Sequence, residues 1–506
     1  DSTLSIAHLN GAIAQANTAT GKTTLADGAT VFSVSSGATI NTGNESAFTT
    51  LLDSEDDGLI ALTDQNLTVD SGTVSVSNAK LLAATTTGTI TASIATDESV
   101  DSLKTLYDTG ETHAYSITIT ATDADASQST AAEFTAINNA TSLAVNAASV
   151  TGLASSSISD IKTLLTAGND TDQFTAASFG SLATAVVSDA TLDVSDLIDA
   201  IGEANTATGQ STADDGATVF TISDATTING GTAANFTTLL THEGNGLLAI
   251  GSQNLTVDSG TMSVANAVAL SATTNGTVTG TITSGTTIAA MLHSVTGFSE
   301  TGHALTITIA SADAETTAEN LSNLYAKTTV AVDASAVTQI TGEVADVNTV
   351  YGAGSSEITG LGDETIVTQD TSGLAVTALN DLDDNTTGTV NAASVTSMTG
   401  SLANLLTAYG SNGITGLGNE TLTVTDTGAS SSLAASDLNS LDSKTSGTVT
   451  TDDDLATLTG TVAALNTAYG SAGLSMGGDE AITISDTTVD AEELNNLNNY
   501  TSGVIN

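Results

Sequence analysis

The residues of this sequence that could do chemistry are acidic, and they recur on glycine-rich turns. In three places an acidic or amide pair precedes a predicted strand, and one more aspartate stands at the end of that strand. Carboxylate and amide oxygens on a turn are ligands that suit Ca²⁺. The pattern predicts calcium-binding turns formed by Asp363, Glu364, Asp370, Asn419, Glu420, Asp426, Asp479, Glu480 and Asp486.

The same turns have an alternative interpretation as a solvated acidic surface that holds no ordered metal. Three acidic runs add candidate cation sites, at 53–57 (DSEDD), 122–127 (TDADAS) and 452–454 (DDD). The sequence contains neither an EF-hand loop nor the glycine-rich nonapeptide that binds calcium in β-helices. Calcium is therefore the one cofactor that the sequence indicates, and both interpretations stay open.

Histidine forms no catalytic or metal-binding pattern. Of the five histidines only His113 and His303 occupy equivalent positions, and we expect isolated histidines of this kind to be structural or exposed. The others are His8, His242 and His293. Because the sequence has no cysteine and no HExxH pattern, zinc chemistry lacks a ligand set.

One short string matches a catalytic motif. Residues 473–477 read GLSMG, which fits the GxSxG pattern of a nucleophile elbow. That motif needs a strand before the serine and a helix after it, whereas here a predicted helix precedes and a predicted strand follows. The sequence also has no P-loop and no dinucleotide-binding fingerprint. We therefore expect a protein that is not an enzyme.

The charge of the chain disfavours two kinds of partner. Its 57 acidic and 6 basic residues give a formal net charge of −51 at pH 7, which repels nucleic acid and anionic membrane surfaces. No apolar run approaches the ~20 residues that a membrane span needs. Hydrophobic residues make up 40% of the chain and aromatic residues only 3%, so we expect a thin aliphatic core. Divalent cations would relieve the self-repulsion of so many carboxylates.

Two levels of internal repeat organise the sequence. At the coarse level, ANTATG, DGATVF, FTTLL and NLTVDSGT each occur twice with the same offset between their copies, as in 66–73 and 254–261. This predicts one repeat region at 1–188 and a partial second copy at 189–331. From residue 332 onward a shorter repeat takes over, with copies at 332–389, 390–448 and 449–506.

Each short copy alternates between helix and strand. In the middle copy Ser401 is a suitable N-cap, apolar residues follow at helical spacing, and Gly410 ends the pattern. TLTVTD at 421–426 alternates as a strand does, and AASDLNSLD at 434–442 predicts a second short helix. A copy therefore reads as two coils of roughly 29 residues each, within the range of known repeat lengths.

These patterns predict a β-rich α/β repeat protein, an elongated solenoid of short parallel strands and short helices. Neither short helix would be stable alone, so stacking on neighbouring coils must hold it. The alternative architecture is a row of tandem antiparallel β-sandwich domains, because the first two large copies are richer in alternating strand patterns.

The short repeat also resembles a known group of sequences. The run TVNAASVTSMTGSLANLLTAYGSNGITGLGNETLTVTD, with its partner LAASDLNSLDSKTSGTV, is similar to the tandem Thr, Ala, Asp and Gly-rich repeats of giant extracellular or cell-surface proteins of marine bacteria, notably cyanobacteria. The resemblance implies an extracellular setting and a structural or adhesive role. A shorter likeness, AEELNNLNN at 491–499, is to the AELNxLDG repeats of phage tail fibres.

Together these observations predict a self-assembling extracellular structural protein, a subunit of a filament, sheath or surface layer (S-layer) that divalent cations stabilise. Both ends of the sequence fall on repeat boundaries, so we expect head-to-tail stacking of copies into a homopolymer. NxT sequons such as 66–68 permit glycans. The alternative function is an adhesin stalk or a phage fibre-like binding module.

Overall fold

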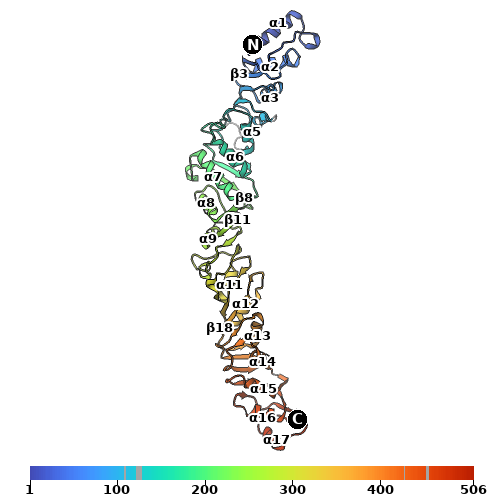
Figure 1. Ribbon diagram of the computed structural model, residues 1–506, viewed down its shortest axis with the longest axis vertical. Coiled ribbons are helices and arrows are strands. Elements are labelled where there is room, and N and C mark those ends of the chain that lie inside the picture. Colours follow the sequence, from blue (N-terminus) through green and yellow to red (C-terminus); the bar gives the residue numbers. More distant parts are fainter. Residues whose placement is uncertain (108–109, 121–127, 427, 452–454) are drawn as a thin grey trace. The chain divides into compact units, whose positions relative to one another are not determined.

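The computed structural model describes residues 1–107, 110–120, 128–426, 428–451 and 455–506 (Figure 1). The described chain is an α/β protein in which many short strands alternate with short helices. It divides into two compact units. Unit 1 comprises residues 1–260 and 272–277, and unit 2 comprises residues 261–271 and 278–506.

Unit 1 carries three parallel sheets, with strand orders β1-β2-β3-β4-β5, β6-β7-β9 and β8-β10-β11. Its helices are α1 (Ile6–Thr20), α2 (Glu45–Asp56), α3 (Val76–Thr85), α4 (Val100–Leu103), α5 (Ala131–Asn139), α6 (Ile158–Gly168), α7 (Val194–Thr208) and α8 (Ala233–Gly244), with the 3-10 turns η1 (Leu25–Asp27), η2 (Lys104–Tyr107) and η3 (Ala213–Asp215). Its strands are β1 (Thr3–Ser5), β2 (Thr39–Gly43), β3 (Asn66–Val69), β4 (Ile90–Ser93), β5 (Ala114–Ser116), β6 (Gly152–Ser156), β7 (Thr184–Val187), β8 (Thr191–Asp193), β9 (Val219–Ile222), β10 (Thr227–Gly231) and β11 (Asn254–Met262), the last at the unit boundary.

Unit 2 carries the parallel sheets β12-β13, β14-β16-β18-β20-β22, β15-β17, β19-β21-β23-β25-β27 and β24-β26-β28. Its helices are α9 (Val264–Thr273) at the unit boundary, α10 (Ile288–Met291), α11 (Ala318–Tyr325), α12 (Val344–Gly352), α13 (Val376–Asn385), α14 (Leu402–Gly410), α15 (Ala435–Asp442), α16 (Val462–Gly470) and α17 (Ala491–Asn498), with the 3-10 turn η4 (Ser311–Asp313). Its strands are β12 (Val278–Ile282), β13 (Ala304–Thr306), β14 (Glu315–Thr317), β15 (Val332–Asp333), β16 (Gln339–Gly342), β17 (Ile358–Thr359), β18 (Thr365–Thr368), β19 (Leu374–Ala375), β20 (Val390–Asn391), β21 (Ser397–Gly400), β22 (Ile414–Thr415), β23 (Thr421–Val424), β24 (Gly428–Ala434), β25 (Val449–Thr451), β26 (Leu455–Gly460), β27 (Leu474–Ser475) and β28 (Ala481–Ile484).

Strand direction decides between the two predicted architectures at the level of fold class. Within each unit, every pairing between described strands is parallel. A sandwich of the predicted alternative kind is built from antiparallel strands. The expectation of short parallel strands with short helices is therefore confirmed, and the antiparallel sandwich alternative is wrong for the part of the chain that the structure describes.

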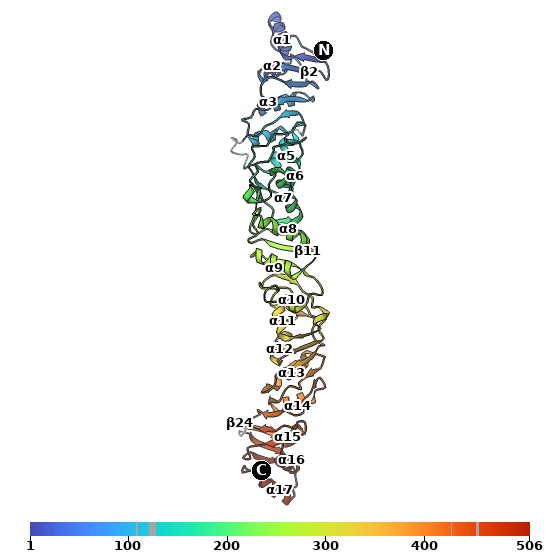
Figure 2. The same ribbon diagram turned by 90° about the vertical axis from the view of Figure 1, so that its left-hand side faces the viewer.

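The short helices form where the sequence offers a cap and an apolar stripe. The Ser401 side chain accepts the Asn404 amide and starts α14, and Leu402, Leu405 and Ala408 of that helix are buried. Consecutive helices from α11 to α17 pack against one another, and both views show them in sequence order (Figures 1 and 2). The buried residues of these helices and strands are mainly aliphatic, as the composition predicts.

Strand pairing in unit 2 repeats with a short and regular step. In sheet β19-β21-β23-β25-β27 the paired apolar residues are Leu374, Met398, Leu422 and Val449, which are buried, and Leu474, which is half-buried; they follow one another at nearly even intervals along the chain. We call the stretch of chain that makes one such step a layer. The helix starts are less even. They fall at Val344, Val376, Leu402, Ala435 and Val462, so that longer and shorter intervals alternate.

An extra strand explains this alternation. In every second layer an additional strand, β19 or β24, precedes the helix and opens a new sheet. Equivalent strands of the three short copies therefore lie in three different sheets: β18 with β14-β16-β20-β22, β23 with β19-β21-β25-β27, and β28 with β24-β26. One copy of the short repeat is thus two layers of unequal length.

The coarse duplication of the sequence is visible in the order of elements. Helix α1 begins at Ile6 and α7 at Val194, and β2, α2, β3, α3, β4 and α4 all recur at that same offset as β10, α8, β11, α9, β12 and α10. The positive-φ glycines Gly21 and Gly58 likewise recur as Gly209 and Gly246. Each copy therefore supplies a natural control for substitutions in the other.

One position breaks that equivalence and yields a stability prediction. Thr42 has φ 62°, a conformation that costs a β-branched residue about 1–2 kcal/mol, whereas its equivalent is Gly230 with φ 78°. Both amides donate to an aspartate, Asp70 or Asp258. We expect Thr42→Gly to stabilise unit 1 by about 1 kcal/mol in urea denaturation, since relief of strain outweighs the added backbone entropy.

The reverse substitution is the matched control. A Cβ on Gly230 would lie 2.2 Å from Asp193 Oδ2, so Gly230→Thr adds a steric conflict to the backbone strain. It should therefore destabilise the protein by at least as much as Thr42→Gly stabilises it. A Thr42→Gly variant that unfolds at lower urea than the parent protein would contradict the strain argument.

Candidate functional site

The three predicted glutamates are buried and serve as hydrogen-bond acceptors. Glu364, Glu420 and Glu480 are at most 1% exposed, each on the turn that leads into β18, β23 or β28. Each carboxylate accepts the hydroxyl of a tyrosine in the preceding helix and a glycine amide two residues earlier on the turn. The pairs are Tyr351–Glu364 (2.6 Å) with Gly362 (2.9 Å), Tyr409–Glu420 with Gly418 (2.8 Å), and Tyr469–Glu480 (3.0 Å) with Gly478 (3.1 Å).

Burial gives these tyrosines a distinct electrostatic setting. Removal from water, together with the adjacent carboxylate, raises the pKa of Tyr351, Tyr409 and Tyr469 well above the usual range of a phenol. The hydroxyl therefore stays protonated and donates to the glutamate. The carboxylate oxygens that a cation would need are occupied by donors from the chain itself.

The three predicted aspartates at the strand ends bind helix N-termini. Asp370 Oδ2 accepts the amide of Val344 at 2.7 Å, Asp426 Oδ2 that of Leu402 at 2.5 Å, and Asp486 Oδ2 that of Val462 at 2.7 Å. In each case the aspartate caps the helix of the layer before it, where a negative charge meets the positive end of the helix dipole. These carboxylates fasten successive layers together.

The remaining predicted ligands, Asp363, Asn419 and Asp479, have exposed side chains. Because the strands that follow them lie in three different sheets, like residues of successive copies do not stack over one another. Among the residues that the structure describes, no group of three or more His, Asp or Glu side chains could hold a metal ion. Residues 53–57 lie at the end of α2, whereas the predicted runs 122–127 and 452–454 fall outside the described residues.

A corner motif of threonine and glycine was not anticipated from the sequence. The hydroxyl of Thr445 donates to the backbone oxygen of Glu420 (2.7 Å) and accepts the Gly447 amide (3.0 Å). The same pair of bonds occurs at Thr86–Gly88, Thr274–Gly276, Thr386–Gly388 and Thr501–Gly503. The signal in the sequence is the recurring TxG string before a β-branched residue.

Asparagines on the helices form a second set of links that sequence reasoning missed. The side-chain amide of each donates to a backbone carbonyl of the following helix at 2.9 to 3.1 Å. The bonds are Asn348 to Ala378, Asn380 to Asn404, Asn439 to Ala464 and Asn466 to Glu493. The signal in the sequence is an asparagine at the same place, the fifth residue, of α12, α13, α15 and α16.

The two equivalent histidines are structural, as expected of isolated histidines. His113 and His303 are 3% and 7% exposed, and their Nδ1 atoms accept the amides of Ile90 (3.3 Å) and Val278 (3.1 Å) in the neighbouring strand. Their buried Nε2 atoms have no hydrogen-bond partner within the described chain. Burial lowers the pKa of both rings, against a smaller opposing influence of Glu111 and Glu300.

These rings predict a pH dependence of stability. Because the folded-state pKa is below the unfolded value of 6.5, the unfolded chain takes up protons first as the pH falls. The melting temperature should therefore decrease by a few degrees between pH 6.5 and pH 5, above the range in which most carboxylates titrate. A His113→Gln/His303→Gln variant should lose most of this decrease, since a neutral amide can accept the same amide protons; His242, whose pKa burial also lowers, accounts for the remainder. An equal decrease in both proteins would contradict the assignment.

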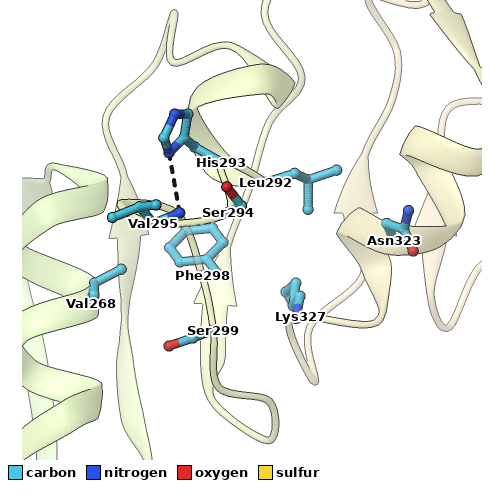
Figure 3. A pocket seen from close by; sticks show the side chains of 10 residues that line it. Val268, Leu292, His293, Ser294, Val295, Phe298, Ser299, Asn323 and Lys327 are labelled. Atoms are coloured by element: carbon cyan, nitrogen blue, oxygen red, sulfur yellow. Dashed lines mark hydrogen bonds between the residues drawn. The ribbon is translucent and has the colours of Figure 1, made fainter.

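One cavity in unit 2 has about 330 Å³ of space. In Figure 3, His293 lies at one side and Asn323 and Lys327 at the other, with Phe298 between them. The Nδ1 atom of His293 accepts the Val295 amide at 3.3 Å. The remaining lining residues are Val268, Leu292, Ser294, Gly297 and Ser299, so none of the residues that line this cavity is a carboxylate that could pair with the histidine.

The GxSxG string also lies in a setting without the geometry of a nucleophile elbow. Ser475 is in β27, α16 precedes it, and the next described element is β28, as the sequence predicted. No helix within the described residues is long and apolar enough to cross a membrane. No known family model matches the sequence, and no curated protein does either.

Proposed function

We propose that the chain is a structural repeat protein of the extracellular space, a component of a filament, sheath or surface layer, in which each unit is a solenoid. The observation that supports this most directly is how the repeated polar residues are used. Six of the carboxylates predicted as ligands instead bind groups of the chain itself: Glu364, Glu420 and Glu480 bind tyrosine hydroxyls, and Asp370, Asp426 and Asp486 bind the helix of the layer before.

The density of links between layers favours a load-bearing role over a catalytic one. The aspartate caps and the threonine corners recur once in each copy of the short repeat, and asparagine links join four successive pairs of helices, on top of parallel strand pairing. In a stacked repeat of this kind, stability is the sum of such contacts between neighbours. Such a chain can be lengthened by adding layers, because the same contacts between neighbouring layers are repeated.

In this proposal divalent cations bind the exposed carboxylates. The net charge of −51 opposes close approach of two copies, and side chains such as Asp363 and Asp479 are exposed to bind ions. The extracellular setting rests on the resemblance to giant surface proteins of marine bacteria. Once ions screen its negative charge, the chain can associate with further copies of itself. Association with nucleic acid is not expected.

Electron microscopy of the purified chain tests the proposal. We expect ordered filaments or sheets in millimolar calcium that dissolve when a chelator is added. Matched ionic strength in sodium chloride is the control, because it separates cation bridging from simple screening. Isolated particles under all three conditions would overturn self-assembly and favour the adhesin stalk.

A further inference from the structure

One joint between neighbouring layers of unit 2 is built differently from two equivalent joints. After α14 and α16, the turn that leaves the helix bonds to the helix before it. The hydroxyl of Ser411 donates to Asp383 Oδ2, and that of Ser471 donates to Asp442 Oδ2, both at 2.6 Å. A Cβ on Gly413 would lie 2.0 Å from Asp383 Oδ1, so the turn and the aspartate are in close contact. These two joints are closed.

The equivalent joint after α12 carries other residues. Tyr325 is the eighth residue of α11, the place that Asp383 holds in α13 and Asp442 holds in α15. The turn between α12 and β17 has five residues, 353–357 (AGSSE), whereas the turn between α14 and β22 has three, 411–413 (SNG). Because the aspartate is replaced and the turn is longer, the bond that closes the other two joints cannot form here.

A cavity of about 530 Å³ lies at this joint. Tyr325 lines it from α11, and Ser356 and Glu357 line it from the long turn. The side chains of these three residues make no hydrogen bond or ion pair within the described chain. Gly354 and Ser355 of the same turn line a further cavity of about 270 Å³. The larger cavity falls within the range of roughly 300–1,000 Å³ that is usual for small-molecule sites, and its polar groups are available to a ligand.

We propose that this cavity, which we call the Tyr325 cavity, binds a neutral carbohydrate, such as one hexose unit of a polysaccharide. A sugar ring has C–H groups on its faces and hydroxyls around its edge. Its face can stack on the aromatic ring of Tyr325, which has an apolar body and a polar tip. The Glu357 carboxylate can accept sugar hydroxyls, and the Ser356 hydroxyl can both donate and accept.

The charge of the chain favours a neutral ligand over an anionic one. Among the described residues, Glu357 is the one charged residue that lines the Tyr325 cavity, and the whole chain carries a formal charge of −51. Both repel phosphates, sulfates and acidic sugars, whereas a neutral sugar is not repelled. The affinity for a neutral sugar should be the same at low and high sodium chloride, because there is no ionic attraction for salt to screen.

Saturation-transfer difference NMR on the purified chain tests this assignment. The probes are the neutral trisaccharides maltotriose, cellotriose and mannotriose, with trigalacturonic acid as the anionic comparison. We expect at least one neutral trisaccharide to receive saturation, most strongly at its ring C–H protons, and trigalacturonic acid to receive none. Tyr325→Ala should weaken binding about tenfold or more, because it removes the stacking surface. The matched control is Tyr107→Ala in unit 1, where the tyrosine is 36% exposed, and it should bind as the wild type does.

Two further variants guard against a folding defect in Tyr325→Ala. Glu357→Ala changes an exposed side chain and should weaken binding about tenfold, through the loss of a charged acceptor. Its control, Glu343→Ala, removes another exposed glutamate of unit 2 and should have no effect. Replacing residues 353–357 by SNG together with Tyr325→Asp restores the residues of the closed joint. That variant should lose binding without a lower melting temperature.

Three results would overturn the proposal: no binding of any neutral trisaccharide, equal binding by Tyr325→Ala and Tyr107→Ala, or an affinity that changes strongly with salt. The inference goes beyond the proposed structural function, and the two can fail separately. A chain that forms calcium-dependent filaments and binds no sugar would disprove the role of the Tyr325 cavity alone. A chain that binds a sugar through Tyr325 and never forms filaments would disprove self-assembly alone.

Discussion

Replacing Gly447 by alanine should destabilise unit 2 by about 3 kcal/mol or more. A Cβ at this position would lie 2.2 Å from the backbone oxygen of Glu420 and 2.5 Å from its carbonyl carbon. Both atoms belong to the backbone of the neighbouring layer and cannot rotate away. The layers would have to separate, which breaks the Thr445 bond to Glu420 and the pairing of β23 with β25.

Urea denaturation followed by circular dichroism measures the loss, and hydrogen exchange at β23 and β25 locates it. The control is Gly410→Ala at the end of α14, where the added Cβ would meet no heavy atom within 4 Å among the described residues, apart from its chain neighbours and the backbone of its own helix. That change should stay within about 0.5 kcal/mol. The same contact, at 2.1 to 2.3 Å, recurs at Gly88, Gly276, Gly388 and Gly503. If Gly447→Ala had the same free energy of unfolding as the wild type, the two layers would not be closely packed at this corner.

Local features of the fold could be predicted from the sequence because their causes are local. Ser401 and the apolar spacing predicted α14, which ends at Gly410 as expected, and the alternation at 421–426 predicted β23 (Thr421–Val424). The extra strands β19 and β24 could not be predicted from periodicity. The short repeat gives the combined length of two layers but does not say which strand pairs with which, and that pairing places equivalent residues in different sheets.

For the candidate site, too, the sequence indicates where the residues lie but not which groups they bind. The acidic turns lie where the sequence placed them, just before the strands, but their partners come from the preceding helix and the neighbouring layer. Tyr409 falls at the apolar spacing of α14, and that spacing gives no sign that its hydroxyl donates to Glu420. One signal was available: ETLTV at 420–424 corresponds to QNLTV at 65–69 and 253–257, and a neutral glutamine in the same corner is a poor substitute for a calcium carboxylate.

Glu420 offers the sharpest test of this structural role. In Glu420→Ala the Tyr409 hydroxyl and the Gly418 amide would be left without an acceptor in a buried site, at a cost of about 3–5 kcal/mol. Glu420→Gln should cost less than about 1 kcal/mol, because the amide oxygen can accept the Gly418 amide and the amide nitrogen can donate to Tyr409. Gln65 and Gln253 already fill the equivalent corners, at 1% and 2% exposure.

Tyr409→Phe completes the comparison by removing the other partner. It leaves the carboxylate with the Gly418 amide alone, so we expect a loss of about 1–3 kcal/mol. Combining Tyr409→Phe with Glu420→Ala, which removes the acceptor and makes no new bond to the hydroxyl, gives a double-mutant cycle that measures the coupling of the pair. Additive losses would show that the hydroxyl and the carboxylate do not interact.

The same variants separate a structural glutamate from a calcium ligand. If Glu420 bound Ca²⁺, saturation at about 100 times the dissociation constant would stabilise the wild type by about 2.7 kcal/mol, and Glu420→Gln would lose that gain. The hydrogen bonds of Glu420 predict the opposite: calcium should raise the melting temperature of both proteins equally, by acting on exposed carboxylates. Magnesium should then act about as well as calcium, because diffuse screening depends on charge and not on ligand geometry. A rise in melting temperature that calcium alone produces, and that is absent in Glu420→Gln, would show that Glu420 is a calcium ligand.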